Sequence, residues 1–241
     1  MDTHRKVVIV TGAGSGVGRA TAVLLGRAGY AVVLAGRTAS KLDDTAAMIE
    51  STEGDSSTIA IDLCDSNSAD AVVKHAVQTF GRVDVLANVA GYASLGSLEE
   101  TSDAEWTRNL GINLNVPFYL TRAVWPHFRD RRGGFIVNVS SMAAKDPFPG
   151  FGAYGTAKAG LNLLTLVTAR EGSEIGVNAI CVAPGAVETP MLRSLFDETI
   201  VPKDATMSPE SLGARIVEYV EGRRPFESGE TVYVLPDDVA E

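Results

Sequence analysis

Short runs of Val, Ile and Ala recur along the chain, and longer stretches with helical periodicity separate them. The runs are apolar at consecutive positions rather than at every second one, and they lie at 6–11, 31–36, 58–62, 83–88, 134–140, 177–183 and 230–235. Strands with this pattern are buried on both faces, which is typical of a parallel sheet covered by helices on both sides.

The helical stretches alternate with these strands one by one. Their predicted ranges are 16–28, 39–51, 66–80, 103–130, 152–171 and 208–221. Alternating strands and helices fold as right-handed βαβ units, so we expect an α/β protein with a doubly wound parallel sheet of about seven strands. Because we find no internal repeat or low-complexity linker, we expect residues 1–241 to form one domain.

Composition restricts the partners of the chain. The net charge of −9 comes from 21 basic and 30 acidic residues, which argues against nucleic acid or an anionic membrane as a partner. No apolar run approaches the roughly 20 residues of a membrane helix, and the run near the N-terminus is too short for a signal peptide. His4, His75 and His127 lack metal-ligand spacing, and Cys64 and Cys181 are isolated. We therefore expect no metal site and a reducing, cytoplasmic setting.

A glycine-rich turn joins the first predicted strand to the first predicted helix. The sequence TGAGSGVG at 11–18 lets the backbone turn tightly and approach a pyrophosphate, while the helix N-terminus offers free N–H groups. A plain flexible loop is the alternative. The turn predicts a dinucleotide phosphate site formed by Gly12, Ser15, Gly16, Val17 and Gly18.

Tyr154 and Lys158 stand four residues apart among small residues, in the sequence GAYGTAKAG. On a helix they share one face and can reach one target. A nearby ammonium favours the phenolate, so we expect the pKa of Tyr154 to fall from about 10 and the phenol to act as a proton donor. Taken alone, the pair could also be a surface Lys and a half-buried Tyr that share a turn.

The order of six motifs resembles the short-chain dehydrogenase/reductase family. Thr11 precedes glycines spaced as G-x-x-x-G-x-G, and the later motifs are NVAG (88–91), INLN (112–115), NVSS (138–141), YGTAK (154–158) and PGAVETP (184–190). The resemblance covers nearly the whole chain. It implies a Rossmann-like fold and hydride transfer between a nicotinamide cofactor and a carbonyl or secondary alcohol.

The resemblance also implies roles for individual residues. Tyr154 would protonate the carbonyl oxygen, and Lys158 would lower the pKa of Tyr154 and hold the nicotinamide ribose. Ser141 would polarise the carbonyl, and Asn113 would hold a water that links Lys158 to solvent. Further cofactor contacts implied are Asp62, Leu63, Asn88, Ala90, Gly91, Pro184, Gly185, Val187 and Thr189.

The end of the second predicted strand bears on which cofactor is used. Gly36 stands where NAD-using relatives commonly have Asp, and the guanidinium of Arg37 can bind a phosphate bidentately. Thr38 and Lys41 are candidates to assist. We therefore predict NADP(H). Gly14 counts against this prediction, because many NADP-using relatives carry a hydroxyl residue there, and NAD(H) is the less favoured alternative.

The chain departs from the family pattern at two positions. Val89 replaces the second Asn of the usual N-N-A-G, and Ile180 stands where the family usually has an Asn. The second change puts a structural hydrogen bond in doubt but not the catalytic residues. We expect Asn88 to tie its strand to a neighbouring one.

The long segment before the last predicted helix is a candidate substrate lid, at about 186–207. Apolar residues suggest an apolar cleft, although they could equally pack the lid itself: Phe148, Phe151, Met191, Leu192, Leu195 and Phe196. The resemblance implies a homodimer or homotetramer formed through 103–130 and 152–171. The sequence 161–169 is apolar on more than one stripe, which requires cover on both sides.

Several functions remain open from the sequence. The first is an NADPH-dependent carbonyl reductase acting on a small molecule, with alcohol oxidation as its reverse. A second is a 3-oxoacyl-[acyl-carrier-protein] reductase, for which the basic sequence RDRR at 129–132 could meet an acidic carrier, although it also suits a helix C-terminus. A β-hydroxy acid or sugar-alcohol dehydrogenase is a third. A non-catalytic dinucleotide sensor or scaffold is the alternative of another class, and the complete Asn, Ser, Tyr and Lys set argues against it.

Overall fold

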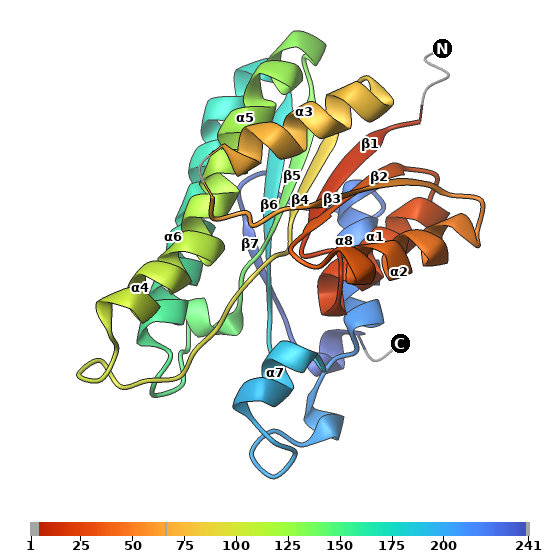
Figure 1. The fold of residues 1–241 in the computed structure, drawn as a ribbon. Helices are drawn as coiled ribbons and strands as arrows, with labels where there is room; N and C mark the ends of the chain where they lie inside the picture. Colours follow the sequence, from red (N-terminus) through yellow and green to blue (C-terminus); the bar gives the residue numbers. More distant parts are fainter. Residues whose placement is uncertain (1–4, 66, 240–241) are drawn as a thin grey trace.

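A computed structural model describes residues 5–65 and 67–239, which form a three-layered α/β structure (Figure 1). The seven-stranded sheet is parallel throughout and has the order β3-β2-β1-β4-β5-β6-β7. Its strands are β1 (Val7–Thr11), β2 (Ala31–Gly36), β3 (Asp55–Ala60), β4 (Val85–Asn88), β5 (Gly134–Val139), β6 (Val177–Pro184) and β7 (Thr231–Val234). The predicted doubly wound, Rossmann-like sheet is confirmed.

Helices cover both faces of the sheet. On one face lie α1 (Gly16–Arg27), α2 (Ala39–Glu50) and α8 (Pro209–Val220), and on the other lie α3 (Ser68–Phe80), α5 (Val116–Arg131) and α6 (Gly152–Gly172) (Figure 1). The packing of β1 explains why its residues are apolar at consecutive positions. Val8 and Val10 pack into one core cluster, while Val7 and Ile9 pack into the cluster on the opposite face.

The third strand begins three residues earlier than predicted. β3 spans Asp55–Ala60 at one edge of the sheet, and its residues Ser56, Ser57 and Thr58 are only half-buried. An edge strand covered incompletely by helices can carry polar side chains, so an apolar run was the wrong guide to its start.

The predicted helix 103–130 is divided by a π-helical turn. The chain forms α4 (Asp103–Leu110), the π-turn η1 (Gly111–Asn115) and then α5. Pro117 lacks an N–H group, so the carbonyl of Asn113 cannot accept the usual bond from the residue four positions later. The backbone N–H of Val116 donates to the carbonyl of Gly111, five residues back, as a π-turn requires. The widened turn is centred on Asn113.

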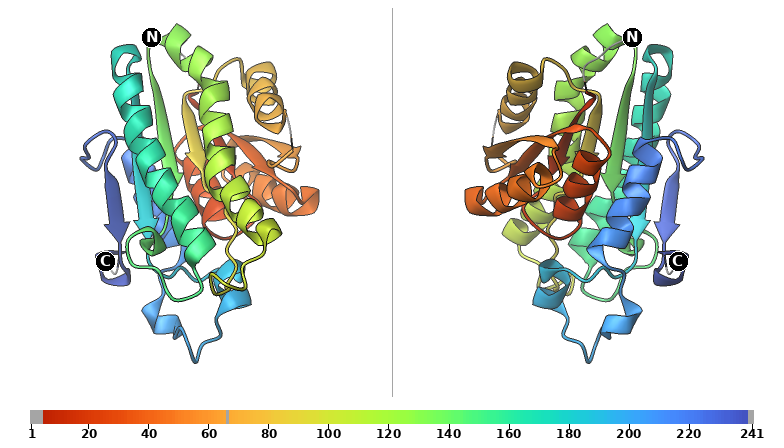
Figure 2. Two further views of the ribbon diagram at one scale, coloured as in Figure 1. Left: turned by 90° about the vertical axis from the view of Figure 1, so that its left-hand side faces the viewer. Right: turned by 90° about the vertical axis from the view of Figure 1, so that its right-hand side faces the viewer.

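The predicted lid contains more structure than its sequence suggested. It includes the short helix α7 (Pro190–Leu195) and the 3₁₀ turn η4 (Lys203–Ala205), and Figure 2 shows this part projecting from the lower end of the molecule. Thr189 accepts a hydrogen bond from the backbone of Leu192, and Pro190 occupies the first helical position. A bridge between Val187 and Met207 joins the two ends of the lid.

Besides η4, the described residues contain three further 3₁₀ turns: η2 (Met142–Ala144), η3 (Ser173–Ile175) and η5 (Pro236–Val239). Within residues 5–65 and 67–239, no helix is long and apolar enough to cross a membrane. The same residues contain no cluster of His, Cys, Asp or Glu that could hold a metal ion.

Candidate active site

A cavity of about 860 Å³ opens at the carboxyl ends of the strands and extends from the glycine-rich turn to α7. Ligands bind at this edge in open parallel sheets. The cavity brings together nearly all residues that the sequence proposed for catalysis and cofactor binding: Gly12, Ser15, Gly16, Val17, Gly18, Arg37, Asp62, Leu63, Ala90, Gly91, Ser141, Tyr154, Lys158, Pro184, Gly185, Val187 and Thr189. Asn88 and Asn113 lie behind its wall.

The glycine-rich turn packs so closely that side chains are excluded. Gly12 has a φ of +68°, and a Cβ added to it would lie 2.9 Å from Cα of Ala90. A Cβ on Gly18 would lie 2.2 Å from the carbonyl oxygen of Gly12. Ser15 makes no side-chain cap bond to α1, so the first N–H groups of this helix remain available to an anion. This cradle fits a dinucleotide pyrophosphate.

Two residues that the sequence analysis missed hold the turn in place. Nη2 of Arg19 donates to the carbonyl of Gly14 at 2.7 Å, and Oγ1 of Thr45 donates to the carbonyl of Ala13 at 2.9 Å. Nε of Arg19 also donates to Oγ1 of Thr45 at 3.1 Å. These bonds fix two carbonyl groups against α2. A signal existed, since Thr45 falls on the buried stripe of α2 between Leu42 and Ile49.

The small residues around Tyr154 allow α6 to approach the turn that carries Ser141. A Cβ on Gly155 would lie 2.8 Å from the carbonyl oxygen of Ala143 in η2. Ser141 caps η2 by accepting a bond from the backbone of Ala143 at 3.1 Å. Tyr154 and Lys158 are both buried in the first turns of α6 and line the cavity with Ser141. Close packing between α6 and η2 therefore explains why small residues surround Tyr154 and Lys158.

Lys158 is a buried cation without an anionic partner among the described residues. Its Nζ donates to the carbonyl of Val139 at 2.7 Å and lies 5.7 Å from the ring centroid of Tyr154. A Cβ on Gly91 would lie 3.7 Å from this Nζ and 3.2 Å from Oδ1 of Asn113. The absence of a side chain at Gly91 leaves room for a ligand next to both polar groups, which fits a ribose.

Asn113 uses its side chain to hold the segment after β4. Its Nδ2 donates to the carbonyls of Tyr92 at 2.7 Å and Asn109 at 3.0 Å, and its Oδ1 accepts from the backbone of Tyr92 at 3.2 Å. The side chain is fully buried, and its polar groups are used. Pro117 removes the N–H group that would normally bond the backbone carbonyl of Asn113, so the water expected at this residue would have to bind that carbonyl and not the side chain.

The expected lowering of the Tyr154 pKa is wrong for the chain by itself. Burial raises the pKa of Tyr154, and the neighbouring Ser141 hydroxyl only opposes this increase. Burial also lowers the pKa of Lys158 from 10.5 to about 8. The same dry environment disfavours both charged forms, and the helical spacing of the two residues could not reveal that burial.

Lys158→Met is expected to raise the free energy of unfolding at pH 7 by roughly 2 kcal/mol, because the cost of burying the charge exceeds the hydrogen bond lost to Val139. This cost is fully present below pH 8 and disappears as pH rises towards 10.5, the value in the unfolded chain. Urea unfolding at pH 7 and near pH 10 tests this. A variant less stable than wild type at pH 7, or a gain that does not shrink at high pH, contradicts it.

Asn88 connects three elements behind the cavity. Its Nδ2 donates to Oδ1 of Asn138 at 2.8 Å, and Nδ2 of Asn138 donates to Oγ1 of Thr165 on α6 at 2.8 Å. The expected tie between neighbouring strands is therefore present, and it extends to the helix with Tyr154. The side chain of Asn88 supports the site from behind and does not line it. Ile180 is fully buried in an apolar cluster, so its position carries no side-chain hydrogen bond.

Arg37 is exposed and lines the cavity directly after β2. Within the described part of the chain, its guanidinium makes no hydrogen bond or ion pair and is free to bind an anion. Lys41 lines the same wall, with its Cβ 3.0 Å from the Cβ position of Gly14. The two cations and the missing carboxylate at Gly36 fit a phosphate on the ribose.

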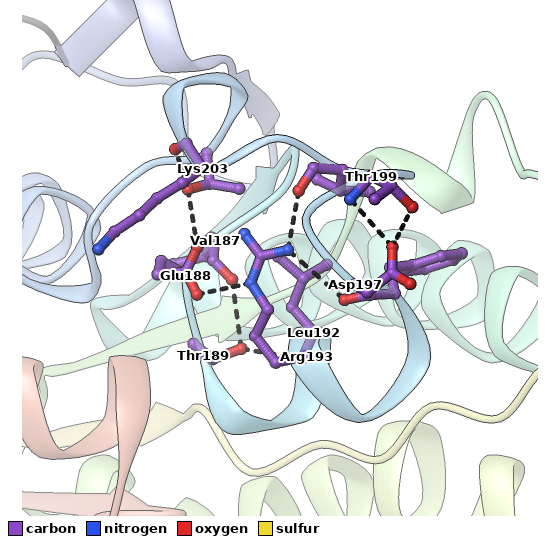
Figure 3. A network of polar contacts seen from close by, with 11 residues as sticks. Val187, Glu188, Thr189, Leu192, Arg193, Asp197, Thr199 and Lys203 are labelled. Carbon is purple, nitrogen blue, oxygen red and sulfur yellow. Dashed lines mark hydrogen bonds and ion pairs between the residues drawn. The ribbon is translucent and has the colours of Figure 1, made fainter.

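Figure 3 shows that charged side chains of the lid bind one another. Nε of Arg193 donates to Oε1 of Glu188 at 2.7 Å, and its Nη1 donates to the carbonyl of Val201 at 2.8 Å. The hydrogen bond from Arg193 lowers the pKa of Glu188. Asp197 accepts bonds from the backbone and hydroxyl of Thr199. The apolar lid residues expected at the cleft do line the cavity: Met191, Leu192, Leu195 and Phe196.

Comparison with known proteins agrees with the geometry of this site. The family model for short chain dehydrogenases matches residues 6–199. A short-chain reductase protein, NovJ, of Streptomyces niveus is 34% identical over 96% of this chain and 93% of its own length. The 3-oxoacyl-[acyl-carrier-protein] reductase FabG of Thermotoga maritima is 36% identical over 81% of this chain and 79% of its own length.

A solved structure extends this similarity to the whole fold. The 3-ketoacyl-(acyl-carrier-protein) reductase from Brucella melitensis, complexed with NADH, superposes with a TM-score of 0.90 at 26% identity. The match covers 98% of this chain and 99% of that one. From the matched family model, the relatives and the fold, it follows that this chain belongs to the short-chain dehydrogenase family.

Proposed function

We propose that the chain is an NADP(H)-dependent oxidoreductase that acts on a carbonyl compound or the corresponding secondary alcohol. The observation that carries the proposal is that Ser141, Tyr154 and Lys158 line the same cavity as the glycine-rich turn and Arg37. A nicotinamide cofactor would supply the hydride for this chemistry. Oxidoreductase relatives support the reaction class.

The side chains provide the proton and the orientation for this reaction. Tyr154 would donate its phenolic proton to the carbonyl oxygen, and the hydroxyl of Ser141 would donate a hydrogen bond to the same oxygen. Burial raises the pKa of Tyr154, which keeps its proton in place until the oxygen gains charge. Lys158 would hold the ribose, and its ammonium would stabilise the phenolate formed in the reaction. A water on the carbonyl of Asn113 would return a proton towards Lys158.

The choice of NADP(H) rests on Arg37, Lys41 and Gly36. Arg37 and Lys41 are cations that line the cavity, and Gly36 beside them offers no carboxylate, which would favour a phosphate over a hydroxyl at the ribose 2′ position. The related reductase from Brucella melitensis holds NADH, so NAD(H) remains the alternative. We also propose that the predicted cofactor-binding residues that line the cavity, from the glycine-rich turn to Thr189, contact the cofactor.

A carbonyl panel assayed with NADPH and with NADH tests this function. We expect consumption of NADPH with at least one activated ketone and slower consumption of NADH. If the pure protein binds either cofactor but reduces no carbonyl and oxidises no alcohol, a sensor or scaffold role replaces the enzyme role. A clear preference for NADH retains the enzyme and overturns the cofactor assignment.

A 3-oxoacyl-[acyl-carrier-protein] reductase is the second candidate, and the FabG relative favours it. The basic sequence 129–132 does not help this candidate. Residues 129–131 form the end of α5 and Arg132 caps it, so this sequence lies at the end of the helix remote from Asn113, about 24 Å along the helix axis. An acyl chain delivered there could not reach Tyr154. Turnover of a 3-oxoacyl carrier protein far above that of a free ketone would favour this candidate.

We also propose a homodimer or homotetramer formed through α4, α5 and α6. These helices lie side by side on one face (Figure 2) and expose apolar side chains: Trp106 (38%), Phe118 (43%), Tyr119 (38%), Leu163 (62%) and Val167 (40%). Leu164, in the same apolar stretch, is half-buried, so Leu163 is the better probe. A second copy of the chain would cover this face.

Leu163→Glu is expected to shift the protein to a monomer, because burying an unpaired carboxylate in the interface is costly. Light scattering on wild type and variant measures the change. Met48→Glu is the matched control, since Met48 is 43% exposed on α2, on the opposite side of the sheet. A wild-type monomer of 25.4 kDa, or a variant that still assembles, contradicts the proposal.

We further infer that residues 1–241 act as one catalytic domain with residues 186–207 as its lid. Residues 1–4, 66 and 240–241 of that range lie outside the described part. Cys64 and Cys181 are both unpaired, which suits the reducing, cytoplasmic setting that we propose.

A further inference from the structure

Four aromatic rings from three segments meet at the substrate end of the cavity. Phe151 is the central ring: its centroid lies 5.3 Å from Tyr154, 6.2 Å from Phe148 and 5.8 Å from Phe196. Phe148 and Phe196 are also 6.0 Å apart. Tyr154 belongs to α6, Phe148 to the loop before it and Phe196 to the end of α7, so the lid and the proposed proton donor share one aromatic wall.

The outer part of this wall is exposed although it lines the cavity. Phe151 and Tyr154 are buried, whereas the side chain of Phe148 is 62% exposed. Two lid residues at the same opening, Met191 and Ile200, are 39% and 63% exposed. Exposed apolar side chains gathered at a cavity mark a surface that an apolar ligand would cover.

Charged groups are nearly absent from this end of the cavity. Among described residues that line it within 139–158 and 184–205, only Asp146 and Lys158 carry charge. Arg108 of α4 lines the cavity too, but its guanidinium lies over the Tyr92 ring, 3.9 Å from the centroid, and within 3.9 Å of Glu105. Lys158 is committed to the reacting end, and Asp146 would repel a carboxylate or phosphate. Arg193, which could have bound an anionic substrate, is paired with Glu188 inside the lid (Figure 3). The opening therefore disfavours anionic substrates.

The bonds of Arg193 also hold the aromatic wall in position. Its Nη1 contacts the carbonyl of Phe196 at 3.5 Å and that of Val201 at 2.8 Å, while its other nitrogens bind Glu188. The end of α7 is thus fixed to Glu188, which precedes the helix, and to Val201, which follows it. A wall held in this way before the substrate arrives can select for the shape of a ring.

We infer that the substrate is an uncharged carbonyl compound with an aromatic ring close to the reacting carbon, and that Phe148 determines this specificity. The inference rests on the proposed function. The ring would pack against Phe148 and Phe196, and its carbonyl oxygen would lie at Tyr154 and Ser141. Edge-to-face and offset contacts between rings favour an aromatic ring over a saturated ring of similar size.

The test compares three ketones with wild-type protein and the preferred cofactor: phenylacetone, cyclohexylacetone and 4-(2-oxopropyl)benzoate. In each of them a methylene group separates the ring from the carbonyl, so intrinsic reactivity is similar. We expect kcat/KM for phenylacetone to exceed that for cyclohexylacetone by about two- to tenfold. The charged ketone should be the poorest of the three.

Phe148→Leu then assigns the preference to one side chain. It keeps an apolar group but removes the ring, so the ratio of kcat/KM between phenylacetone and cyclohexylacetone should fall towards one. Phe80→Leu is the matched control, because Phe80 ends α3, outside both the cavity and the proposed subunit interface, and it should leave the ratio unchanged.

The outcomes separate this inference from the function on which it rests. If cyclohexylacetone or the charged ketone is reduced as well as phenylacetone, or if Phe148→Leu keeps the wild-type ratio, the inference is overturned and the reductase stands. If no ketone of any kind is reduced, the proposed function fails, and the inference fails with it.

Discussion

Tyr154→Phe is expected to reduce kcat by about 10²-fold or more while cofactor binding remains. The substitution removes the phenolic proton next to Ser141 but keeps the ring that packs against Phe151 at 5.3 Å between centroids. The fold of the site should therefore survive, and the loss should lie in the chemical step. Steady-state kinetics at saturating cofactor and ketone, together with a fluorescence titration of the cofactor, separate these effects.

Tyr92→Phe provides the control for this experiment. Tyr92 lines the same cavity, but its hydroxyl donates to Glu105 at 2.9 Å and lies outside the catalytic cluster. We expect kcat within a few-fold of wild type for this variant. Near wild-type turnover of Tyr154→Phe would remove Tyr154 from its assigned role, whatever the control shows.

Arg37→Ala is expected to weaken NADPH binding by about 1.5–3 kcal/mol, the contribution of a hydrogen bond to a charged group. This corresponds to roughly a 10- to 150-fold increase in Kd. NADH should be affected much less, because its ribose carries a hydroxyl where NADPH carries a phosphate. Titrations of both cofactors with wild type and variant measure the difference.

Arg27→Ala controls for the loss of one positive charge. Arg27 is exposed in the last turn of α1, at the opposite end of that helix from the glycine-rich turn. It should leave both cofactors unchanged. Equal losses for NADPH and NADH in Arg37→Ala, or a wild-type preference for NADH, would show that Arg37 does not read the 2′-phosphate.

The sequence predicted the strands correctly where both faces of the strand are buried, because such positions require apolar residues throughout. β1 and β2 are buried along almost their full length, so their runs of Val and Ala identified them. The start of β3 was predicted wrongly, because this strand lies at the sheet edge and carries polar side chains. The π-turn was not predicted either, because the apolar periodicity of 103–130 continues through Asn113. Pro117 disturbs the hydrogen bonding only if the helix has already begun before it, which the sequence alone does not show. Thr189 and Pro190 did carry the start signal of α7, within a segment too short for a periodic pattern.

The sequence predicted which residues form the site, but it did not predict their pKa values or the contacts of the lid. Motif order identified Ser141, Tyr154 and Lys158, and the cavity contains all three. The raised pKa of Tyr154 depends on its burial in a cluster with Ala93, Ala143 and Phe151, which no local spacing encodes. The bond between Arg193 and Glu188 depends likewise on how residues 186–207 fold, and the aromatic wall depends on how they pack against Phe148 and Phe151.

Hydride transfer to a carbonyl carbon is the central claim, and isotope transfer tests it most directly. The protein would be incubated with a ketone and NADPH that carries deuterium at both C4 positions, and the alcohol would be examined by mass spectrometry and proton NMR. We predict an alcohol with one deuterium on the carbinol carbon. An alcohol without deuterium at that carbon, or no alcohol with any ketone of the panel, would contradict the account.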